Sequence, residues 1–310
     1  MCASSHAVTV RPATEGDRLD EINRGSVVWY GEAPLREMSA ATPSQVPQAL
    51  LVAEVDGAPA GFANALGAGV TDGHRGLAYL HVAPAYRGRG VGTALWRAVL
   101  DVCTPERVRG ISIRVDEADA ASLAIATDHG LVPRGLHLES ELDLSAIEHL
   151  RPLVAAARVP GIELRPLPDD ADEELWHRFS AKFDELMADT PDRAEGGEPM
   201  PYPVMRAVLQ QPWQVMCAWR GDRVVGLMAL GIRNRETGLL NTFLTAVDRD
   251  LRRLGIATAL KVAQALQVRD AGWRRIATQN MEGNDAILAA NRRLGFVPVA
   301  ALRDLTYDYR

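Results

Sequence analysis

Cysteine is scarce in this sequence: its 310 residues include only Cys2, Cys103 and Cys217. The three are widely spaced, with no C-x-x-C pair and no cluster of histidines, so the sequence predicts neither a disulfide framework nor a metal site. No apolar run reaches the roughly 18 residues of a membrane-spanning helix. The first residues also lack the charged start and apolar centre of a signal peptide. We therefore expect a soluble cytoplasmic protein without a membrane partner.

An excess of positive charge is also absent. The chain has 34 lysines and arginines against 40 aspartates and glutamates, which gives a net charge of −6. Proteins that bind nucleic acids usually present a basic face, so this balance argues against a nucleic-acid partner. The hydrophobic content of 47% is that of an ordinary globular protein. A chain of 310 residues is long enough for about two domains, each with its own core.

The stretch from Leu77 to Cys103 combines an apolar strand, a glycine-rich loop and a helix. The strand ends at Pro84, the loop A-Y-R-G-R-G-V-G follows, and apolar residues then recur at helical spacing. Such a corner suits an anion, because glycines let the backbone approach and the N–H groups of the helix start point at a phosphate. The sequence therefore predicts a phosphate site at this corner.

Three kinds of anion-binding loop compete for this stretch. A P-loop would need G-x-x-x-x-G-K-[ST], which the chain does not contain. The dinucleotide motif G-x-G-x-x-G fits at Gly88 and Gly90, but Thr93 stands where the third glycine is needed. The third pattern, R-x-x-G-x-G, is met by Arg87, Gly90 and Gly92. One hexapeptide of this kind also arises by chance in surface loops.

A second copy of the stretch follows later in the chain. Leu239–Val247 reads as a strand, and Arg252, Gly255 and Ala257 fill R-x-x-G-x-[GA] before the next helix. Three pairs share one offset of 165 positions: Arg87 with Arg252, Gly61 with Gly226, and Gly130 with Gly295. Three anchors in one register indicate an internal duplication.

Both copies have the same expected order of elements. In the first we expect a strand at 7–11, a helix capped by Thr14, a hairpin of strands 50–55 and 60–66, a strand at 110–115, a helix at 118–128 and a strand at 136–142. The second repeats this with strands at 214–220, 224–232, 239–247 and 275–279, helices at 255–269 and 285–294, and a final strand near 302–309. Residues 145–160 bridge the halves, so we expect domains at 1–157 and 158–310.

The second half starts with an acidic segment. Residues 161–199 hold 12 acidic and 4 basic side chains. Leu175, Phe179, Phe183 and Leu186 recur there at helical spacing, which predicts an amphipathic helix. The acidic side chains form either its solvated outer face or a rim that attracts a cationic substrate such as an amine.

The two corner motifs resemble the pyrophosphate loop of GNAT-superfamily acyltransferases, and the resemblance covers nearly the whole chain. In the second half it extends through L-R-R-L-G-I-A-T-A-L-K, the N-M-E-G-N string from Asn280, and N-R-R-L-G-F from Asn291. Tandem members of the superfamily, of which mycothiol synthase is one, share this layout. The resemblance implies an α/β (α+β) fold of two tandem GNAT domains, each a mixed, mostly antiparallel sheet flanked by helices.

The resemblance also implies acetyl-CoA as the cofactor. Loop N–H groups would hold its pyrophosphate in each half, and the pantetheine arm would lie along the preceding strand, where a strand N–H would polarise the thioester carbonyl. The implied cofactor-binding residues are His81, Val82, Ala83, Arg87, Gly88, Arg89, Gly90, Val91, Gly92 and Thr93 in the first half, and Thr245, Ala246, Val247, Arg252, Arg253, Leu254, Gly255, Ile256, Ala257, Thr258, Asn284 and Asn291 in the second.

The catalytic residues implied by the resemblance are less complete. Many GNAT enzymes have a tyrosine before the G-F turn that protonates the leaving thiolate, but this chain has Ala126 there in the first half and Asn291 in the second. Asn291 can still hydrogen-bond the sulfur or the pantetheine amide. His81 is either a general base or a packed strand residue. Asn280 and Asn284 either line the second groove or cap turns and helices.

The leading interpretation is an acetyl-CoA-dependent N-acetyltransferase acting on a small amine, such as an amino sugar, an amino acid or an antibiotic. We place catalysis in the second half, because its acidic segment and its asparagines look adapted to a substrate. The missing tyrosine favours an alternative, a non-catalytic protein that senses CoA or sequesters a ligand. Mycothiol-type acetylation of a thiol sugar and protein-lysine acetylation are further alternatives. A monomer and a homodimer are both compatible with the sequence.

Overall fold

A computed structural model describes residues 7–23, 31–42, 46–67, 75–156, 159–190 and 202–309. The chain divides into two compact units. Unit 1 comprises Met1–Gly135 together with Leu302–Arg310, and unit 2 comprises Leu136–Ala301. The helices of the described residues include none that is long and apolar enough to cross a bilayer.

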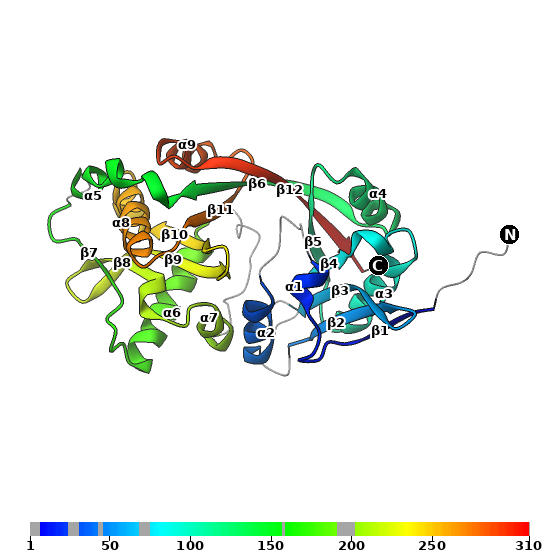
Figure 1. Cartoon of the computed structure of the whole chain (residues 1–310). Helices are drawn as coiled ribbons and strands as arrows, with labels where there is room; N and C mark the ends of the chain where they lie inside the picture. The colour runs from blue at the N-terminus through cyan, green and yellow to red at the C-terminus, as the bar shows by residue number, and fades with distance from the viewer. Residues whose placement is uncertain are drawn as a thin grey trace. The chain divides into compact units, whose positions relative to one another are not determined.

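Unit 1 is a six-stranded sheet with helices on its faces (Figure 1). Its strands lie in the order β1-β2-β3-β4-β5-β12, and its neighbours are antiparallel except for the parallel pair β4 and β5. The elements are β1 (Val8–Pro12), α1 (Leu19–Ile22), α2 (Glu32–Ala41), β2 (Gln48–Val55), β3 (Ala58–Gly67), β4 (Arg75–Val82), η1 (Pro84–Tyr86), α3 (Val91–Val102), β5 (Gly110–Asp116), α4 (Ala120–Asp128) and, from Leu302 onward, β12 (Val297–Asp308).

The core of unit 1 has a layer on each face of its sheet. Helix α3 turns Val91, Leu95 and Val99 toward one face, and these side chains are at most 1% exposed. On the other face α1 packs Leu19 against Phe62 of β3. Burial of these apolar side chains stabilises the unit and fixes where α3 begins relative to β4.

Unit 2 repeats this plan. Its strands lie in the order β6-β11-β10-β9-β8-β7, and β10 with β11 is its parallel pair. The elements are β6 (Val132–Asp143), η2 (Leu144–Ala146), η3 (Glu148–Leu150), α5 (Pro152–Ala156), β7 (Glu163–Pro166), α6 (Glu173–Ala188), α7 (Tyr202–Val208), η5 (Pro212–Gln214), β8 (Val215–Arg220), β9 (Arg223–Asn234), β10 (Leu239–Val247), η6 (Arg249–Leu251), α8 (Ile256–Asp270), β11 (Arg275–Met281) and α9 (Asp285–Arg293). Helix α8 covers one face, and α6 and α7 cover the other. The predicted fold class is confirmed.

The last strand of each sequence half lies in the unit built mainly from the other half. In unit 1, β12 pairs with β5 over seven positions, from Leu302 opposite Asp116 to Asp308 opposite Gly110. In unit 2, β6 pairs with β11 from His137 to Asp143. Because β6 and β12 are equivalent strands of the duplication, each takes the other's place and both sheets keep the same set of strand pairings. The final strand expected to close the second domain therefore belongs to unit 1. The domain boundary expected at 157/158 lies outside the described residues, and it stays a prediction about the sequence repeat.

Most expected elements are confirmed, and one expected cap is wrong. The hairpin of β2 and β3 turns at Asp56 and Gly57, whose φ angles of 53° and 81° suit a two-residue turn. Thr14 does not cap α1, because the helix begins later, at Leu19. Instead, the backbone N–H and the hydroxyl of Thr14 both donate to the carboxylate of Asp17.

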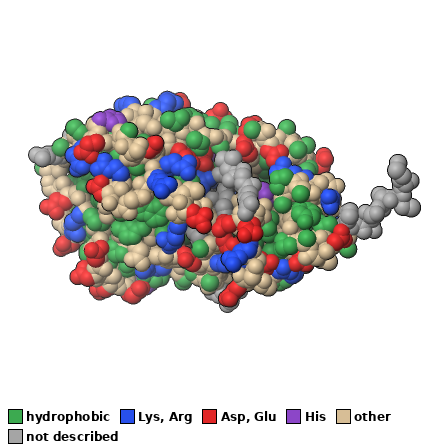
Figure 2. Space-filling view, viewed as in Figure 1, with side chains coloured by type: hydrophobic (Ala, Val, Ile, Leu, Met, Phe, Trp, Pro, Cys, Tyr) green, Lys and Arg blue, Asp and Glu red, His purple; other side chains and the backbone are tan. Residues whose placement is uncertain are grey.

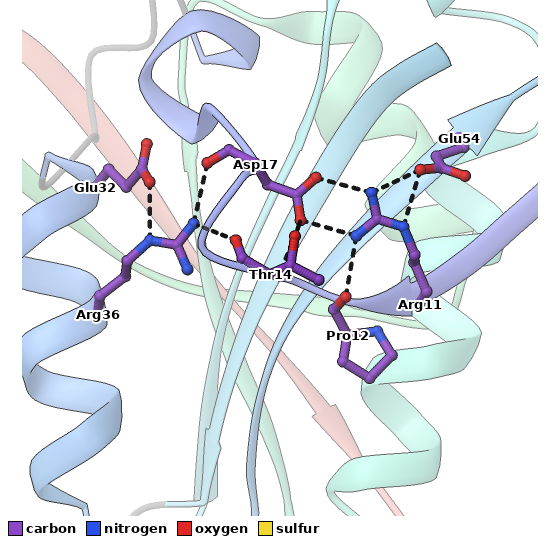
Figure 3. Close-up of polar contacts among 7 residues, drawn as sticks. All are labelled: Arg11, Pro12, Thr14, Asp17, Glu32, Arg36 and Glu54. Carbon is purple, nitrogen blue, oxygen red and sulfur yellow. Dashed lines mark hydrogen bonds and ion pairs between the residues drawn. The ribbon is translucent and has the colours of Figure 1, made fainter. Parts of the chain in front are cut away.

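A polar network fastens α1 and α2 to the edge of the unit 1 sheet (Figure 3). The guanidinium of Arg11 on β1 donates to both carboxylate oxygens of Asp17 at 2.8 Å, and to Glu54 on β2. Arg36 of α2 donates to the carbonyls of Thr14 and Asp17. The hydrogen bond from Arg11 is the largest reason why the pKa of Asp17 lies well below its ordinary 3.8. Asp17 is therefore a charged anchor at neutral pH.

The strand exchange predicts that the C-terminal residues stabilise unit 1. Apart from β12, β5 pairs within the described residues with β4 alone, over three residues. A chain ending at Ala301 should therefore lose the protection of β4 and β5 amides in hydrogen exchange, while β9 and β10 keep theirs. Leu305→Ala should destabilise the same unit by about 2–5 kcal/mol, because Leu305 is fully buried. Loss of protection confined to unit 2 would contradict the exchange.

Asp17 provides a second prediction, on stability and pH. Asp17→Asn removes the charged acceptor of Arg11 and should lower the unfolding free energy by about 2 kcal/mol at pH 7, measured in urea. Because the folded pKa is lowered, this contribution is complete above the ordinary pKa and is lost as the pH falls below about 4. Glu148→Gln in the exposed Glu148–Arg151 pair is the control and should change little. An equal effect of Asp17→Asn at pH 7 and pH 3 would refute the assignment.

Candidate functional site

The first predicted anion loop is a tight corner between β4 and α3. Gly88 and Gly90 adopt left-handed φ angles of 75° and 81°, and Gly90 is the N-cap of α3. The guanidinium of Arg87 folds back, and its Nε donates to the carbonyl of Val82 at 3.4 Å. The first N–H groups of a helix have no acceptor within the helix, and Gly90 has no side chain to cap them. The corner therefore offers these donors to an anion.

The second predicted loop has the same conformation. Arg253 and Gly255 have φ angles of 67° and 81°, at the positions that match Gly88 and Gly90, and Gly255 is the N-cap of α8. Nε of Arg252 donates to the carbonyl of Val247 at 3.1 Å, as Arg87 does to Val82. The geometry is thus duplicated although only one of the two left-handed positions in the second loop is glycine.

The strand before each corner separates from its parallel neighbour. Strand β4 pairs with β5 only over Arg75–Leu77, and β10 pairs with β11 only over Leu239–Asn241. Asp248 next to the end of β10 donates its N–H to Val225 of β9, at 2.9 Å. Because donors alternate along a strand, the N–H of Val247 points to the other side, toward the gap that β11 leaves. In unit 1 the N–H of Ala83 donates to the carbonyl of Ala60, so the N–H of Val82 points in the same way toward the gap that β5 leaves.

His81, a candidate base of the sequence, lies on β4 in the layer opposite α3. Its ring lies 6.2 Å from that of Phe62. Burial, and then the positive charge of Arg87, lowers the pKa of His81, while a hydrogen bond with the backbone of Ile22 raises it. Its Nε2 is buried and has no partner among the described residues. The imidazole is therefore neutral at pH 7, as a base must be, but it belongs to unit 1.

The other two catalytic candidates meet in unit 2. Nδ2 of Asn291 on α9 donates to Oδ1 of Asn280 on β11 at 2.7 Å, and Asn291 is 2% exposed. Asn284 occupies the N-cap position of α9 but makes no side-chain cap bond. The structure thus brings Asn280 and Asn291 together, at the part of β11 that no longer pairs with β10.

Sequence reasoning missed the third member of this cluster, Lys261 of α8. Its Nζ donates to Oδ1 of Asn291 at 2.5 Å, and the residue is 4% exposed. The signal was available, because the repeat offset of 165 positions sets Lys261 against Trp96 in the middle of an apolar helix face. In unit 1, Trp96 is buried and packs edge-on against Tyr307, and Ala126 holds the place of Asn291. Unit 1 is apolar where unit 2 has a lysine and two amides.

A second buried polar cluster of unit 2 was also missed. Glu139 of β6 accepts from Nη1 of Arg233 at 2.9 Å and from Nε2 of Gln279 at 2.6 Å. Both ion-pair partners are at most 4% exposed. Side chains alternate along a strand, so Gln279 points to the sheet face opposite its neighbour Asn280. Polar groups therefore lie on both faces of the sheet in unit 2.

Several acidic side chains of the segment make internal contacts in its described part. Asp172 caps α6 through the N–H of Leu175, and Glu173 accepts from the hydroxyl of Tyr202. Asp189 pairs with Arg252 of the corner and with Arg249. Residues 191–199 lie outside the described residues, so the substrate rim stays a prediction. On the face drawn in Figure 2, basic and acidic side chains are interspersed.

Comparisons with known proteins agree with this geometry. A model of the acetyltransferase (GNAT) family matches residues 18–131, which include the first corner. Two curated relatives are named mycothiol acetyltransferase. The one from Thermobispora bispora is 25% identical over 233 residues, 70% of this chain and 71% of its own length. The one from Brachybacterium faecium is 28% identical over 202 residues, 64% of this chain and 52% of its own length.

A solved structure shares the fold over nearly the whole chain. It is a tandem GNAT protein from the clavulanic acid biosynthesis pathway, with a TM-score of 0.72 and 19% identity over 97% of this chain and 98% of its own. The family model covers the first corner, and this likeness extends the fold to the second. The family model over residues 18–131, the two curated relatives and the shared fold together support a tandem GNAT acetyltransferase.

Proposed function

We propose that unit 2 transfers the acetyl group of acetyl-CoA to the amine of a small molecule, and that unit 1 retains the fold and the anion loop. The observation that carries the proposal is the duplicated corner, with left-handed residues at matching positions and a strand that leaves its parallel neighbour. The polar cluster of Lys261, Asn280 and Asn291 favours unit 2 as the catalytic one, since Trp96 and Ala126 occupy the matching positions in unit 1.

The residues at the corners fit a coenzyme with phosphates and a long arm. A Cβ built on Gly88 or Gly90 meets no atom within 4 Å, so these glycines border open space on the outer side of the loop. In unit 2 the hydroxyl of Thr245 on β10 is buried without a partner among the described residues, which suits a ligand group in the adjacent gap. When bound, acetyl-CoA supplies the thioester whose acetyl group is transferred.

Each part of unit 2 has a role in this proposal. Backbone N–H groups from Arg253 to Thr258 bind the phosphates, with Arg252 held beside them by Val247 and Asp189. The N–H of Val247, directed at the gap, polarises a carbonyl oxygen there, as oxyanion donors do. The amine approaches from the face that carries the cluster of Glu139, Arg233 and Gln279.

Mycothiol-type acetylation of a thiol sugar is a second candidate. It is favoured by the names of the two curated relatives, which match 70% and 64% of this chain. Their identities of 25% and 28% leave the acceptor open, so an amino sugar that bears a thiol belongs among the amines to be tested.

Coenzyme binding tests the two corners separately. Arg252→Glu with Gly255→Asp should lower the number of CoA molecules bound per chain by one, because a carboxylate repels phosphate and a side chain at φ 81° strains the loop. Arg87→Glu with Gly90→Asp should do the same at unit 1. Isothermal titration calorimetry measures both. Arg253→Gly is the matched control and should retain the site, because Gly88 already has this conformation in unit 1. Unchanged stoichiometry in the unit 2 variant would refute the placement.

Turnover separates an enzyme from a binding protein. With acetyl-CoA and a panel of amino sugars, amino acids and aminoglycosides, the wild type should release free CoA thiol, detected with a thiol reagent. The unit 1 double variant should keep this activity, and the unit 2 double variant should lose it. Coenzyme binding without thiol release for any amine would favour the sensing or sequestering alternative. Activity that disappears only with the unit 1 variant would reverse the assignment.

A further inference from the structure

Lys261 is a buried cation with no carboxylate to pair with it among the described residues. Its side chain is 4% exposed and is flanked in α8 by Leu260 and Val262, which are also buried. Burial alone lowers its pKa to about 8. Its described neighbours are amides and an aromatic ring: Asn291 at 2.5 Å, Asn280 behind it, and the ring of Phe296 at 5.5 Å. A buried charge without a counter-ion destabilises a fold, so its presence calls for a function.

The ammonium group decides which way the amide of Asn291 points. An ammonium donates hydrogen bonds and cannot accept them, so it fixes the Oδ1 of Asn291 toward Nζ. The amide nitrogen then faces away from Lys261, and one of its two N–H groups goes to Asn280. The second N–H has no acceptor in the described part of the chain. Without the cation, the amide could rotate by half a turn and exchange its oxygen and nitrogen.

This free donor lies where the strands of unit 2 separate. Asn280 stands three residues beyond Ala277, the last residue of β11 that pairs with β10. Side chains alternate along β11, so Asn280 shares the α8 and α9 face with Ile276, which is part of that core. On β10, the buried hydroxyl of Thr245 also lacks a partner among the described residues. Asn280, which accepts from Asn291, and Thr245 thus lie on the two separating strands, each beyond the last residue at which β10 and β11 pair.

We propose that Lys261 is a positioning residue that holds the free amide N–H of Asn291 toward the thiol sulfur of coenzyme A bound in unit 2. The inference rests on the proposed function, since it needs the coenzyme in the gap between β10 and β11. An N–H donor backed by a buried positive charge favours a sulfur that carries negative charge over a neutral one. Asn291 then stabilises the thiolate as a fixed donor, where a tyrosine would give up a proton. Trp96 and Ala126 exclude this role in unit 1.

The test compares the binding of CoA with that of desulfo-CoA, which lacks the sulfur. The parent protein is the full chain carrying Arg87→Glu and Gly90→Asp, so that only unit 2 binds the coenzyme. At pH 7, below the pKa of Lys261, this parent should bind CoA about fivefold more tightly than desulfo-CoA, because only CoA offers a sulfur to the N–H group of Asn291 and one hydrogen bond contributes about that factor. Lys261→Met, which is close in shape and uncharged, should bring this ratio close to one. It should also raise the pH at which the bound thiol ionises, followed by the ultraviolet absorbance of the thiolate.

Two further variants make the outcome decisive. Asn291→Asp keeps an oxygen for Lys261 but has no N–H donor, so it should also lose the preference for CoA, and it decides the matter if Lys261→Met does not fold. Lys182→Met removes another buried lysine, one that pairs with Asp248 and Glu185, and should keep the parent's ratio. The parent's ratio in Lys261→Met and in Asn291→Asp would overturn the positioning role alone. Failure of the parent to bind either coenzyme would contradict the proposed function itself.

Discussion

Backbone N–H groups that the helix itself cannot bond, at a strand-to-helix corner, are the constraint on which the rest of this protein depends. A helix cannot satisfy its own first donors, and in both units the residue at the N-cap is a glycine at φ 81°, which has no side chain to satisfy them. The arginine of each loop bonds back to the end of its strand and so holds the loop in place. The anion that we propose for this corner would complete its hydrogen bonding, and the same conformation is present in both diverged copies.

The two copies differ in what lies behind the corner. Unit 1 fills the space with the indole of Trp96 against Tyr307, an apolar contact that stabilises the core. Unit 2 places a cation and two amides there, which stabilises the fold less and leaves one N–H of Asn291 without an acceptor among the described residues. A duplicated fold can diverge in this way, because one copy suffices for the chemistry and the other is free to become more stable. The exchange of β6 and β12 further links the two units in one chain.

Much of this architecture could be predicted from the sequence. The offset of 165 positions, the R-x-x-G-x-G and R-x-x-G-x-A loops and the alternation of apolar residues are local patterns, and they depend on backbone geometry that nearby residues determine. The left-handed position of Arg253 could not be predicted in this way, because glycine is the usual residue there. Nor could the failure of Thr14 to cap α1, since the competing partner, Asp17, is itself bound by Arg11 of β1.

The sequence by itself determined the duplication, the class of fold and the positions of the two strand-to-helix corners, because each rests on short-range spacing. Tertiary structure alone decided which strands complete which unit, because β6 and β12 are equivalent in pattern and either could pair with β5 or β11. It also decided that Lys261 lies beside Asn291. These residues are 30 positions apart on different helices, and only packing brings an ammonium and an amide within hydrogen-bonding distance in an apolar interior.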